Sequence, residues 1–205
     1  MKIIIFGATG GVGRELVVQA LARGHEVTAL ARDPTALHTT HERLRVVQGS
    51  VLDGPTVEAA VAGHQAVLCA LGSRSLIRRD NICSTGTSCI VAAMSKHGIR
   101  RLVVCSSSGV GDSRTNIPWI GRPIVAWVVA DKEAQEQVVR LSDTDWTLVR
   151  PTGLRDAAPR GDVAVAMPGP LPTRQIARAD VAAFMLDQLT SDVYVRQAPA
   201  ISWRG

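Results

Sequence analysis

The sequence has 205 residues, of which 46% are hydrophobic, 20% charged and 3% aromatic, and its formal net charge is +5. This size and composition fit one globular domain with a substantial core. The basic residues are scattered and aromatic residues are few, which argues against a stacking surface for nucleic acid, and no apolar run is long enough to span a bilayer. We therefore expect a cytoplasmic monomer that binds a small molecule, with neither nucleic acid nor membrane as partner.

A glycine-rich segment near the N-terminus is the most informative pattern. The apolar run 3–6 leads directly into 7–13, which reads Gly-Ala-Thr-Gly-Gly-Val-Gly, and a helix is predicted from Gly11 to Arg23, followed by a strand at 27–31. A strand, a glycine turn and a helix in this order present bare backbone N–H groups and a helix N-terminus to a pyrophosphate. This context favours a dinucleotide site over a turn that only allows tight packing.

The residue that follows the second strand predicts which dinucleotide is bound. Cofactors without a 2′-phosphate usually meet an Asp or Glu there, about 20 residues after the turn. This chain has Arg32, whose guanidinium can pair with a 2′-phosphate, although Asp33 comes directly after it. An inward Asp33 would weaken that preference, and a solvent-exposed Arg32 is the alternative. We predict NADP(H) as the cofactor.

Alternating strand and helix patterns continue along the chain. Short apolar runs predict strands, and apolar residues at helical spacing predict helices. Nearly all residues of 66–71 are apolar, as expected of a strand covered on both faces. We predict an α/β doubly wound parallel sheet (Rossmann fold), with 1–205 as a single domain. The predicted strands are 44–48, 66–71, 102–105 and 146–149, and the predicted helices are 57–61, 81–96, 124–141 and 178–189.

Ligands of such a sheet bind beyond the carboxyl ends of its strands. After the third strand, Asp53 either accepts a hydrogen bond from the adenine amino group or caps the next helix. The fourth strand ends in Leu71 and Gly72, where a glycine lets the cofactor approach the backbone. These residues are candidates for the cofactor site.

Hydroxyl groups and a proline end the next two strands. Ser106, Ser107 and Ser108 follow the fifth strand beside the predicted nicotinamide position. Pro151 and Thr152 follow the sixth strand and form a rigid turn that we expect under the nicotinamide. Hydroxyls at strand ends often only satisfy loop backbone, which is the alternative for each serine.

Two proline-rich segments are expected to form the walls of a shallow, open substrate cleft. Residues 151–177 are predicted to be irregular apart from a short strand at 163–165, and irregular backbone at the end of a parallel sheet often forms a substrate wall. The opposite wall is 109–123, which carries Trp119. Arg122 and Arg174 either bind acidic groups of the substrate or are surface charges.

The chain lacks a residue pair that many enzymes of this fold use. A Tyr-x-x-x-Lys pair on the helix after the fifth strand exchanges a proton with the substrate, but the single tyrosine, Tyr194, lies far from that helix. Lys132 and Glu136 do lie there and are interpreted as an exposed i,i+4 ion pair. The sequence thus favours hydride transfer to an acceptor that takes its proton from water.

No metal site is predicted. The cysteines show no Cys-x-x-Cys spacing and are interpreted as thiols in a reducing compartment, mostly buried. The histidines fall in predicted loops or helix ends and are expected to face solvent. The residues concerned are Cys69, Cys83, Cys89 and Cys105, and His25, His38, His41, His64 and His97.

The chain resembles the biliverdin reductase B family, also called NADPH flavin reductases, along nearly its whole length. Members are atypical short-chain dehydrogenases/reductases without the Tyr-Lys pair, and they pass the nicotinamide hydride to flavins or biliverdin in an open site. The resemblance implies the same for this chain, with flavin as a loosely bound substrate. It is carried by Ile-Phe-Gly-Ala-Thr-Gly at 5–10, Arg32-Asp33, Gly-Ser-Val-Leu-Asp at 49–53, Val-Ala-Gly-His-Gln-Ala-Val at 61–67, Leu-Gly-Ser-Arg at 71–74, Ile-Val-Ala-Ala-Met-Ser-Lys-His-Gly at 90–98, Cys-Ser-Ser at 105–107 and Ala-Phe-Met-Leu at 183–186.

Carried over residue by residue, the resemblance assigns Ser107 as the active-site serine, which holds the carboxamide or the substrate near the transfer path. It assigns Arg32 to the 2′-phosphate, and Val51 and Asp53 to the adenine pocket. The chain has Thr152 where mammalian members carry a His after the proline of the sixth strand. The phosphate turn corresponds to Gly7, Thr9, Gly10, Val12 and Gly13.

Two other functions are compatible with the glycine turn. One is an NmrA-like redox sensor that binds NADP without turnover, and the other is a dehydratase or epimerase of nucleotide sugars. The missing Tyr-Lys pair and the short C-terminal region speak against the second.

Overall fold

The computed structural model describes residues 1–72, 81–111, 122–167 and 169–205, with the backbone alone for 122–126. Its centre is an eight-stranded sheet in the order β3-β2-β1-β4-β5-β6-β10-β8. All neighbouring strands pair in parallel except β10 and β8, which are antiparallel. The predicted doubly wound parallel sheet is confirmed. Its strands are β1 (Lys2–Phe6), β2 (Glu26–Ala31), β3 (Leu44–Gln48), β4 (Ala66–Cys69), β5 (Arg101–Cys105), β6 (Asp145–Pro151), β8 (Val163–Ala166) and β10 (Ala200–Trp203).

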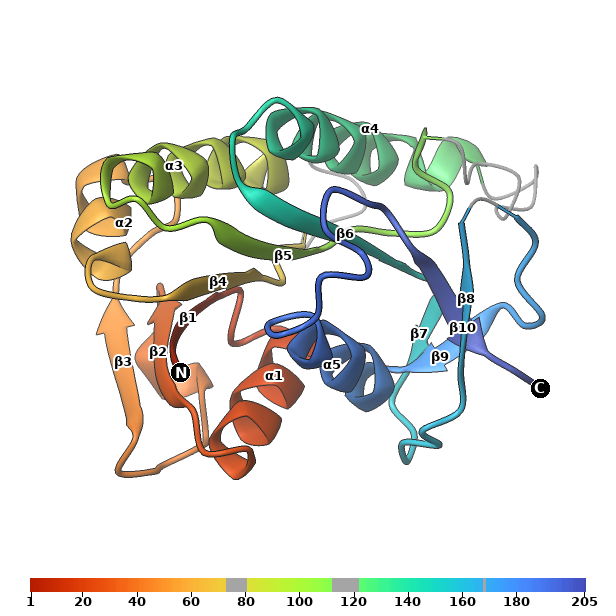
Figure 1. Cartoon of the computed structure of the whole chain (residues 1–205), viewed down its shortest axis with the longest axis horizontal. Coiled ribbons are helices and arrows are strands. Elements are labelled where there is room, and N and C mark those ends of the chain that lie inside the picture. Colours follow the sequence, from red (N-terminus) through yellow and green to blue (C-terminus); the bar gives the residue numbers. More distant parts are fainter. Residues whose placement is uncertain (73–80, 112–121, 168) are drawn as a thin grey trace.

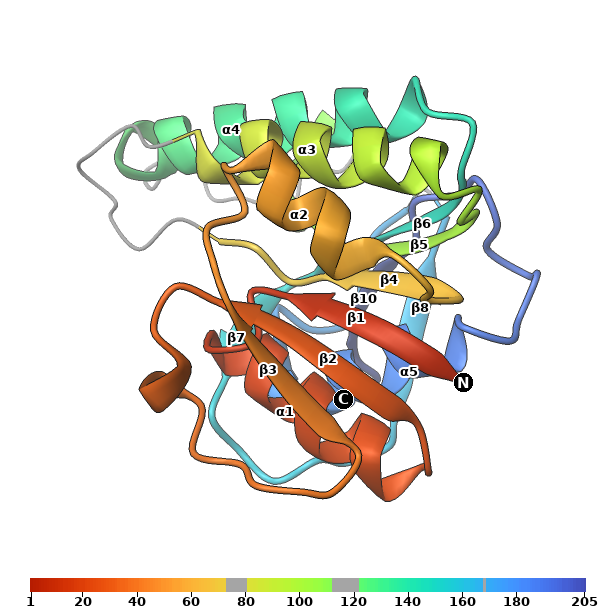
Figure 2. The same cartoon turned by 90° about the vertical axis from the view of Figure 1, so that its left-hand side faces the viewer.

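Helices cover both faces of the sheet, as Figures 1 and 2 show. One face carries α1 (Gly11–Ala22) and α5 (Arg178–Asp187), and the other carries α2 (Gly54–Val61), α3 (Ile82–Lys96) and α4 (Arg122–Arg140). None of the helices in the described residues is long and apolar enough to cross a membrane.

The pleat of the strands divides the core into two layers. Successive side chains of a strand point to opposite faces, so Ile3 and Ile5 pack with Leu16 of α1, whereas Ile4 and Phe6 pack with residues of α2 and α3. This explains why β1 reads as an unbroken apolar run, because both of its faces are buried.

The segment 151–177 is more regular than the sequence predicted. It contains the expected strand near 163–165 but also β7 (Gly153–Arg155) and β9 (Gln175–Ala177), which form a separate two-stranded parallel sheet. The two strands have three residues each, too few for a periodic pattern to be recognised. The sequence patterns also do not predict β10, a strand of four residues.

A buried carboxylate fixes the loop that follows β7. Asp180, only 2% exposed, accepts hydrogen bonds from the backbone N–H groups of Arg160 and Gly161 and from the indole Nε1 of Trp203, the last at 2.7 Å. The guanidinium of Arg160 lies 3.9 Å from the centre of the Trp203 ring. One side chain at the start of α5 therefore holds the predicted substrate wall against β10.

The cysteines are free thiols, and three of the four are buried. The prediction that the histidines face solvent is wrong for His64, which is 8% exposed. Its Nδ1 lies 3.0 Å from the carbonyl of Val61 and its Nε2 lies 2.8 Å from the hydroxyl of Thr28. Both ring nitrogens have partners, which is what allows the imidazole to be buried.

Candidate functional site

A cleft of about 410 Å³ lies at the carboxyl ends of β1, β2, β4 and β5, and we call it the cofactor cleft. The structure brings most of the predicted cofactor residues together there. Those that line it are Gly7, Thr9, Gly10, Gly11, Val12, Arg32, Val51, Leu71, Gly72, Ser106 and the predicted catalytic Ser107.

Two glycines of the turn occupy positions where any side chain would clash with the backbone. Gly7 has a φ of +78°, and a Cβ on it would lie 2.4 Å from the carbonyl oxygen of Ala70. Gly13 is buried behind the turn, where a Cβ would lie 2.0 Å from the oxygen of Gly7. The N-terminus of α1 carries no acidic residue in its first turn, and a diphosphate fits such a helix end.

Arg32 lines the cleft at the end of β2, and its side chain is exposed. Asp33 is directed elsewhere, because its Oδ1 accepts hydrogen bonds from the backbone N–H of Thr35 at 3.0 Å and from the Thr35 hydroxyl at 2.6 Å. The carboxylate caps the short 3₁₀ turn Pro34–Ala36 and does not line the cleft. At the end of β2 the Arg32 guanidinium, and not the Asp33 carboxylate, therefore lines the cleft.

We predict that Arg32→Ala weakens NADPH binding and leaves NADH binding nearly unchanged. Loss of a charge-assisted contact costs about 1.5–3 kcal/mol, roughly tenfold to a hundredfold in the dissociation constant. Titration calorimetry with both cofactors measures the difference. Arg43→Ala, an exposed arginine directly before β3, is the matched control. An equal loss for NADH and NADPH would reject the assignment.

The two residues predicted for the adenine pocket separate in the structure. Val51 lines the cleft and is buried. Asp53 is the residue before α2, where its carboxylate accepts a hydrogen bond from the Thr56 hydroxyl, and it does not line the cleft. Asp53 thus occupies the N-cap position of α2, although its carboxylate makes no capping hydrogen bond to the backbone of the helix.

The serines at the end of β5 point in different directions. The Ser106 hydroxyl donates to Glu136 Oε1 at 2.7 Å, toward α4. The Ser107 hydroxyl is half-buried and donates to the carbonyl of Ser108 at 3.2 Å. Ser107 is thus oriented by its own loop, and no described imidazole, carboxylate or phenol activates it.

Glu136 is the centre of a buried polar network. Its carboxylate accepts hydrogen bonds from Arg150 Nε at 2.8 Å and Nη2 at 2.7 Å, as well as from Ser106, and Arg140 approaches it at 3.3 Å. Burial alone would raise the pKa of Glu136, but the hydrogen bonds from Arg150 and Ser106 outweigh it and hold the pKa below its ordinary value. The network joins α4 to β6 and to the cleft wall.

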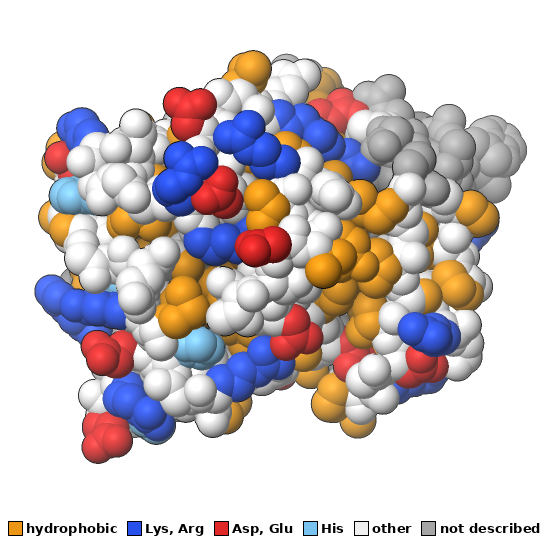
Figure 3. All heavy atoms as spheres, viewed as in Figure 1, with side chains coloured by type: hydrophobic (Ala, Val, Ile, Leu, Met, Phe, Trp, Pro, Cys, Tyr) orange, Lys and Arg blue, Asp and Glu red, His pale blue; other side chains and the backbone are white. Residues whose placement is uncertain are grey.

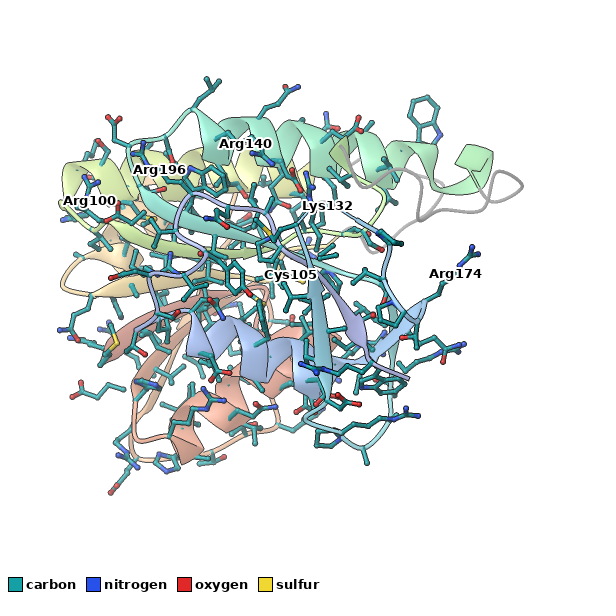
Figure 4. The ribbon with its side chains drawn as sticks, turned by 45° about the vertical axis from the view of Figure 1, so that its right-hand side comes forward. Arg100, Cys105, Lys132, Arg140, Arg174 and Arg196 are labelled. Atoms are coloured by element: carbon teal, nitrogen blue, oxygen red, sulfur yellow. The ribbon has the colours of Figure 1, made fainter. Side chains whose placement is uncertain are left out.

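Lys132 lines the cleft but is buried, with 6% of its surface exposed. Its Nζ donates to the carbonyls of Leu71 and Cys105, each at 2.7 Å, and to Gln135 Oε1 at 2.9 Å. Figure 4 shows the side chain directed from α4 toward the end of β5. The prediction of an exposed Lys132–Glu136 ion pair is wrong, because this face of α4 packs on the strand ends and each residue has other partners there.

The remaining predicted residues lie outside the cleft. Pro151 and Thr152 are buried at the end of β6, and the Thr152 hydroxyl has no hydrogen-bond partner within the described residues. Arg174 is exposed and points away from the body of the molecule (Figure 4). Arg122 begins α4, with its side chain outside the described residues, and Trp119 lies outside them altogether.

Sequence reasoning missed further residues that line the cleft, among them Val128, Leu154 and Arg178. Val128 lies one helical turn before Lys132, so an apolar side chain occupies the place where the Tyr-x-x-x-Lys spacing would put a tyrosine. That spacing, applied to Lys132, would have found both residues. The residues that surround Arg178 and Leu154 in the cleft are distant from them in sequence. No local sequence pattern therefore indicates that these two residues line the cleft.

Over the face drawn in Figure 3, basic side chains are interspersed with acidic ones. The net charge of +5 is therefore not gathered into one patch on that face.

Known proteins match this chain over most of its length. The model of an NAD(P)H-binding family matches residues 7–192. The (4-alkanoyl-5-oxo-2,5-dihydrofuran-3-yl)methyl phosphate reductase of Streptomyces griseus is 30% identical, over 98% of this chain and 67% of that protein.

Solved structures share the fold. ChuY, an anaerobillin reductase from Escherichia coli O157:H7, is 24% identical with a TM-score of 0.85, over 98% of this chain and 96% of that one. A short-chain dehydrogenase/reductase from Veillonella parvula in complex with NADP is 22% identical with a TM-score of 0.82, over 100% of this chain and 95% of that one. With the glycine turn, Arg32 and a family match over most of its length, the chain belongs to the NAD(P)H-binding family.

Proposed function

We propose that the protein is an NADPH-dependent reductase that delivers a hydride to a planar, electron-poor acceptor, a flavin or an open-chain tetrapyrrole. The observation that carries the proposal is the set of polar groups at the β5 end of the cofactor cleft, where we expect the nicotinamide. Among the described residues there, the side-chain donors Lys132 and Ser107 already donate to other protein groups, which favours an acceptor that takes its proton from water.

Each polar group at that end has another role. The three hydrogens of the Lys132 ammonium are all donated to protein oxygens, which fixes the ends of β4 and β5. Burial raises the pKa of the Cys105 thiol to about 11, so it stays protonated at neutral pH and is neither an effective acid nor a thiolate. Ser107 donates to Ser108 and has no coupled base.

The residues present suit NADPH and a loosely held acceptor. When bound, the cofactor supplies the hydride. The glycine turn would hold its diphosphate and Arg32 the 2′-phosphate of its adenosine half. Lys132 keeps the strand ends in place, and Leu154 offers an apolar surface at the rim, where it is 36% exposed. The S. griseus relative is a reductase, and ChuY is an anaerobillin reductase of the same fold.

The test is anaerobic NADPH consumption with FMN, riboflavin or biliverdin in excess. We expect consumption well above the uncatalysed rate with at least one acceptor, and the purified protein should be colourless because flavin is released. Arg32→Ala should require more NADPH for the same rate. Tight NADPH binding without consumption for any acceptor would overturn the proposal and indicate an NADP-binding sensor.

We predict that Ser107→Ala lowers turnover by less than about tenfold and leaves NADPH affinity unchanged. Loss of a true general acid costs about 10²–10⁴-fold, and a serine without a coupled base is a poor acid. The turnover number and its pH profile are compared between Ser107→Ala and the parent. A loss above a hundredfold with a new pH dependence would identify Ser107 as the proton donor.

A further inference from the structure

Arg178, the first residue of α5, lies across the glycine turn at the other end of the chain. A Cβ on Gly11 would lie 2.4 Å from Arg178 Nε and 2.5 Å from its Cδ, so the stem of the arginine rests on the bare Cα of Gly11. Arg178 also lines the cofactor cleft, and its side chain is 27% exposed. The positively charged side chain of Arg178, from α5, thus lies at the N-terminus of α1.

The packing of α5 on α1 fixes the backbone at this point. The two helices lie side by side on one face of the sheet (Figures 1 and 2). Gln19 Nε2 of α1 donates to the carbonyl of Ala179 at 2.9 Å, directly next to Arg178. The position of Arg178 over the turn therefore follows from the core.

The guanidinium itself is held weakly. Its Nη1 pairs with Asp156 Oδ1 at 2.7 Å, and the side chain of Asp156 is 88% exposed. Ion pairs with so exposed a partner contribute little to stability, so Arg178 can exchange Asp156 for a stronger anion at small cost.

We propose that Arg178 binds the diphosphate of the cofactor together with the backbone N–H groups of the glycine turn. The diphosphate carries two negative charges beside the N-terminus of α1, and a guanidinium forms bidentate hydrogen bonds with phosphate oxygens. The inference depends on NAD(P)H binding, which the family shows, and not on the identity of the acceptor. Arg178 would contact the diphosphate, which NADH and NADPH share, whereas Arg32 would contact the 2′-phosphate, which only NADPH carries.

The binding of cofactor fragments distinguishes the role of Arg178 from that of Arg32. We measure by titration calorimetry the binding of NADPH, NADH, ADP-ribose and 2′-AMP to the parent, Arg178→Ala and Arg32→Ala. Arg178→Ala should weaken the three diphosphate ligands by a common factor of about ten or more and leave 2′-AMP unchanged. Arg32→Ala should weaken NADPH and 2′-AMP and leave ADP-ribose unchanged.

Asp156→Asn tests whether Arg178 acts only by fastening its loop. This variant breaks the same ion pair but keeps the guanidinium and removes its competitor, so it should bind ADP-ribose at least as tightly as the parent. Arg178→Lys should recover part of the lost affinity, and Arg178→Gln replaces Arg178→Ala should the latter not fold. The proposal is overturned by an unchanged affinity of Arg178→Ala for ADP-ribose, by an equal loss for 2′-AMP, or by a loss in Asp156→Asn that matches that of Arg178→Ala.

Discussion

Glu136→Ala is expected to lower the free energy of unfolding by about 3–5 kcal/mol, the usual cost of removing one partner from a buried ion pair. Arg150 and Glu136 are 3% and 4% exposed, and the guanidinium donates two hydrogen bonds to the carboxylate. Without Glu136 a buried positive charge lacks that carboxylate, and the Ser106 hydroxyl at the cleft loses its acceptor. Urea unfolding of both proteins measures the loss.

Arg140→Ala is the matched control for this variant. Arg140 contacts the same carboxylate at 3.3 Å from a 43% exposed position, so its removal should cost less than about 1 kcal/mol. Losses of similar size for Arg140→Ala and Glu136→Ala would show that burial of the Arg150–Glu136 pair does not determine stability here.

The same pair predicts a pH dependence. The pKa of Glu136 in the folded protein is lowered from 4.5, so the folded state favours the ionised form more than the unfolded state does. Its stabilising contribution is fully present above pH 4.5 and is lost as the pH falls through the folded-state pKa. The stability difference between the parent and Glu136→Gln should therefore be largest near neutral pH and should shrink in acid. A difference that is constant down to the acid transition contradicts this assignment.

Gly13→Ala should abolish tight NADPH binding and destabilise the fold. The new Cβ would lie 2.0 Å from the oxygen of Gly7 and 2.8 Å from the Cα of Ala8, both backbone atoms that cannot rotate away. The start of α1 must shift from the turn, and the N–H groups that meet the diphosphate shift with it. Overpacking of this kind costs about 1–3 kcal/mol in stability. Because hydrogen bonds weaken steeply with poor geometry, we expect affinity to fall at least about tenfold.

Gly54→Ala provides the comparison. Gly54 is the first residue of α2, with no atom within 4 Å of its added Cβ, so alanine should be neutral or slightly stabilising there. Calorimetry with NADPH and thermal unfolding are run on both variants. If Gly13→Ala binds NADPH as Gly54→Ala does, the turn does not place the diphosphate.

The parts of the fold that the sequence predicted well are those encoded by local patterns. Most strands from β1 to β6 are built on short apolar stretches, and the helices between them repeat apolar residues at helical spacing. The glycine turn and Arg32 were recognisable because their spacing follows from a strand, a turn and a helix in fixed order. The structure places both in one cleft.

The misjudged residues are those whose surroundings come from distant segments. An i,i+4 Lys–Glu pair looks the same in sequence whether its helix face meets water or strand ends. The partners of Lys132 include Leu71 and Cys105, and those of Glu136 include Arg150 on β6. Only the sheet order brings these residues together.

The order of strands in the sheet has a consequence for how the protein folds during its synthesis. Strand β10 lies between β6 and β8, although it follows both in sequence. While the chain emerges from the ribosome, β1 to β5 can pair as they appear, but β8 has no neighbour in the main sheet until residues 200–203 arrive. The edge of β6 stays open until then, and an unpaired edge can pair with other chains. Completion of the sheet is therefore a late, non-local step of folding, and the β6-β10-β8 side of the sheet is assembled last.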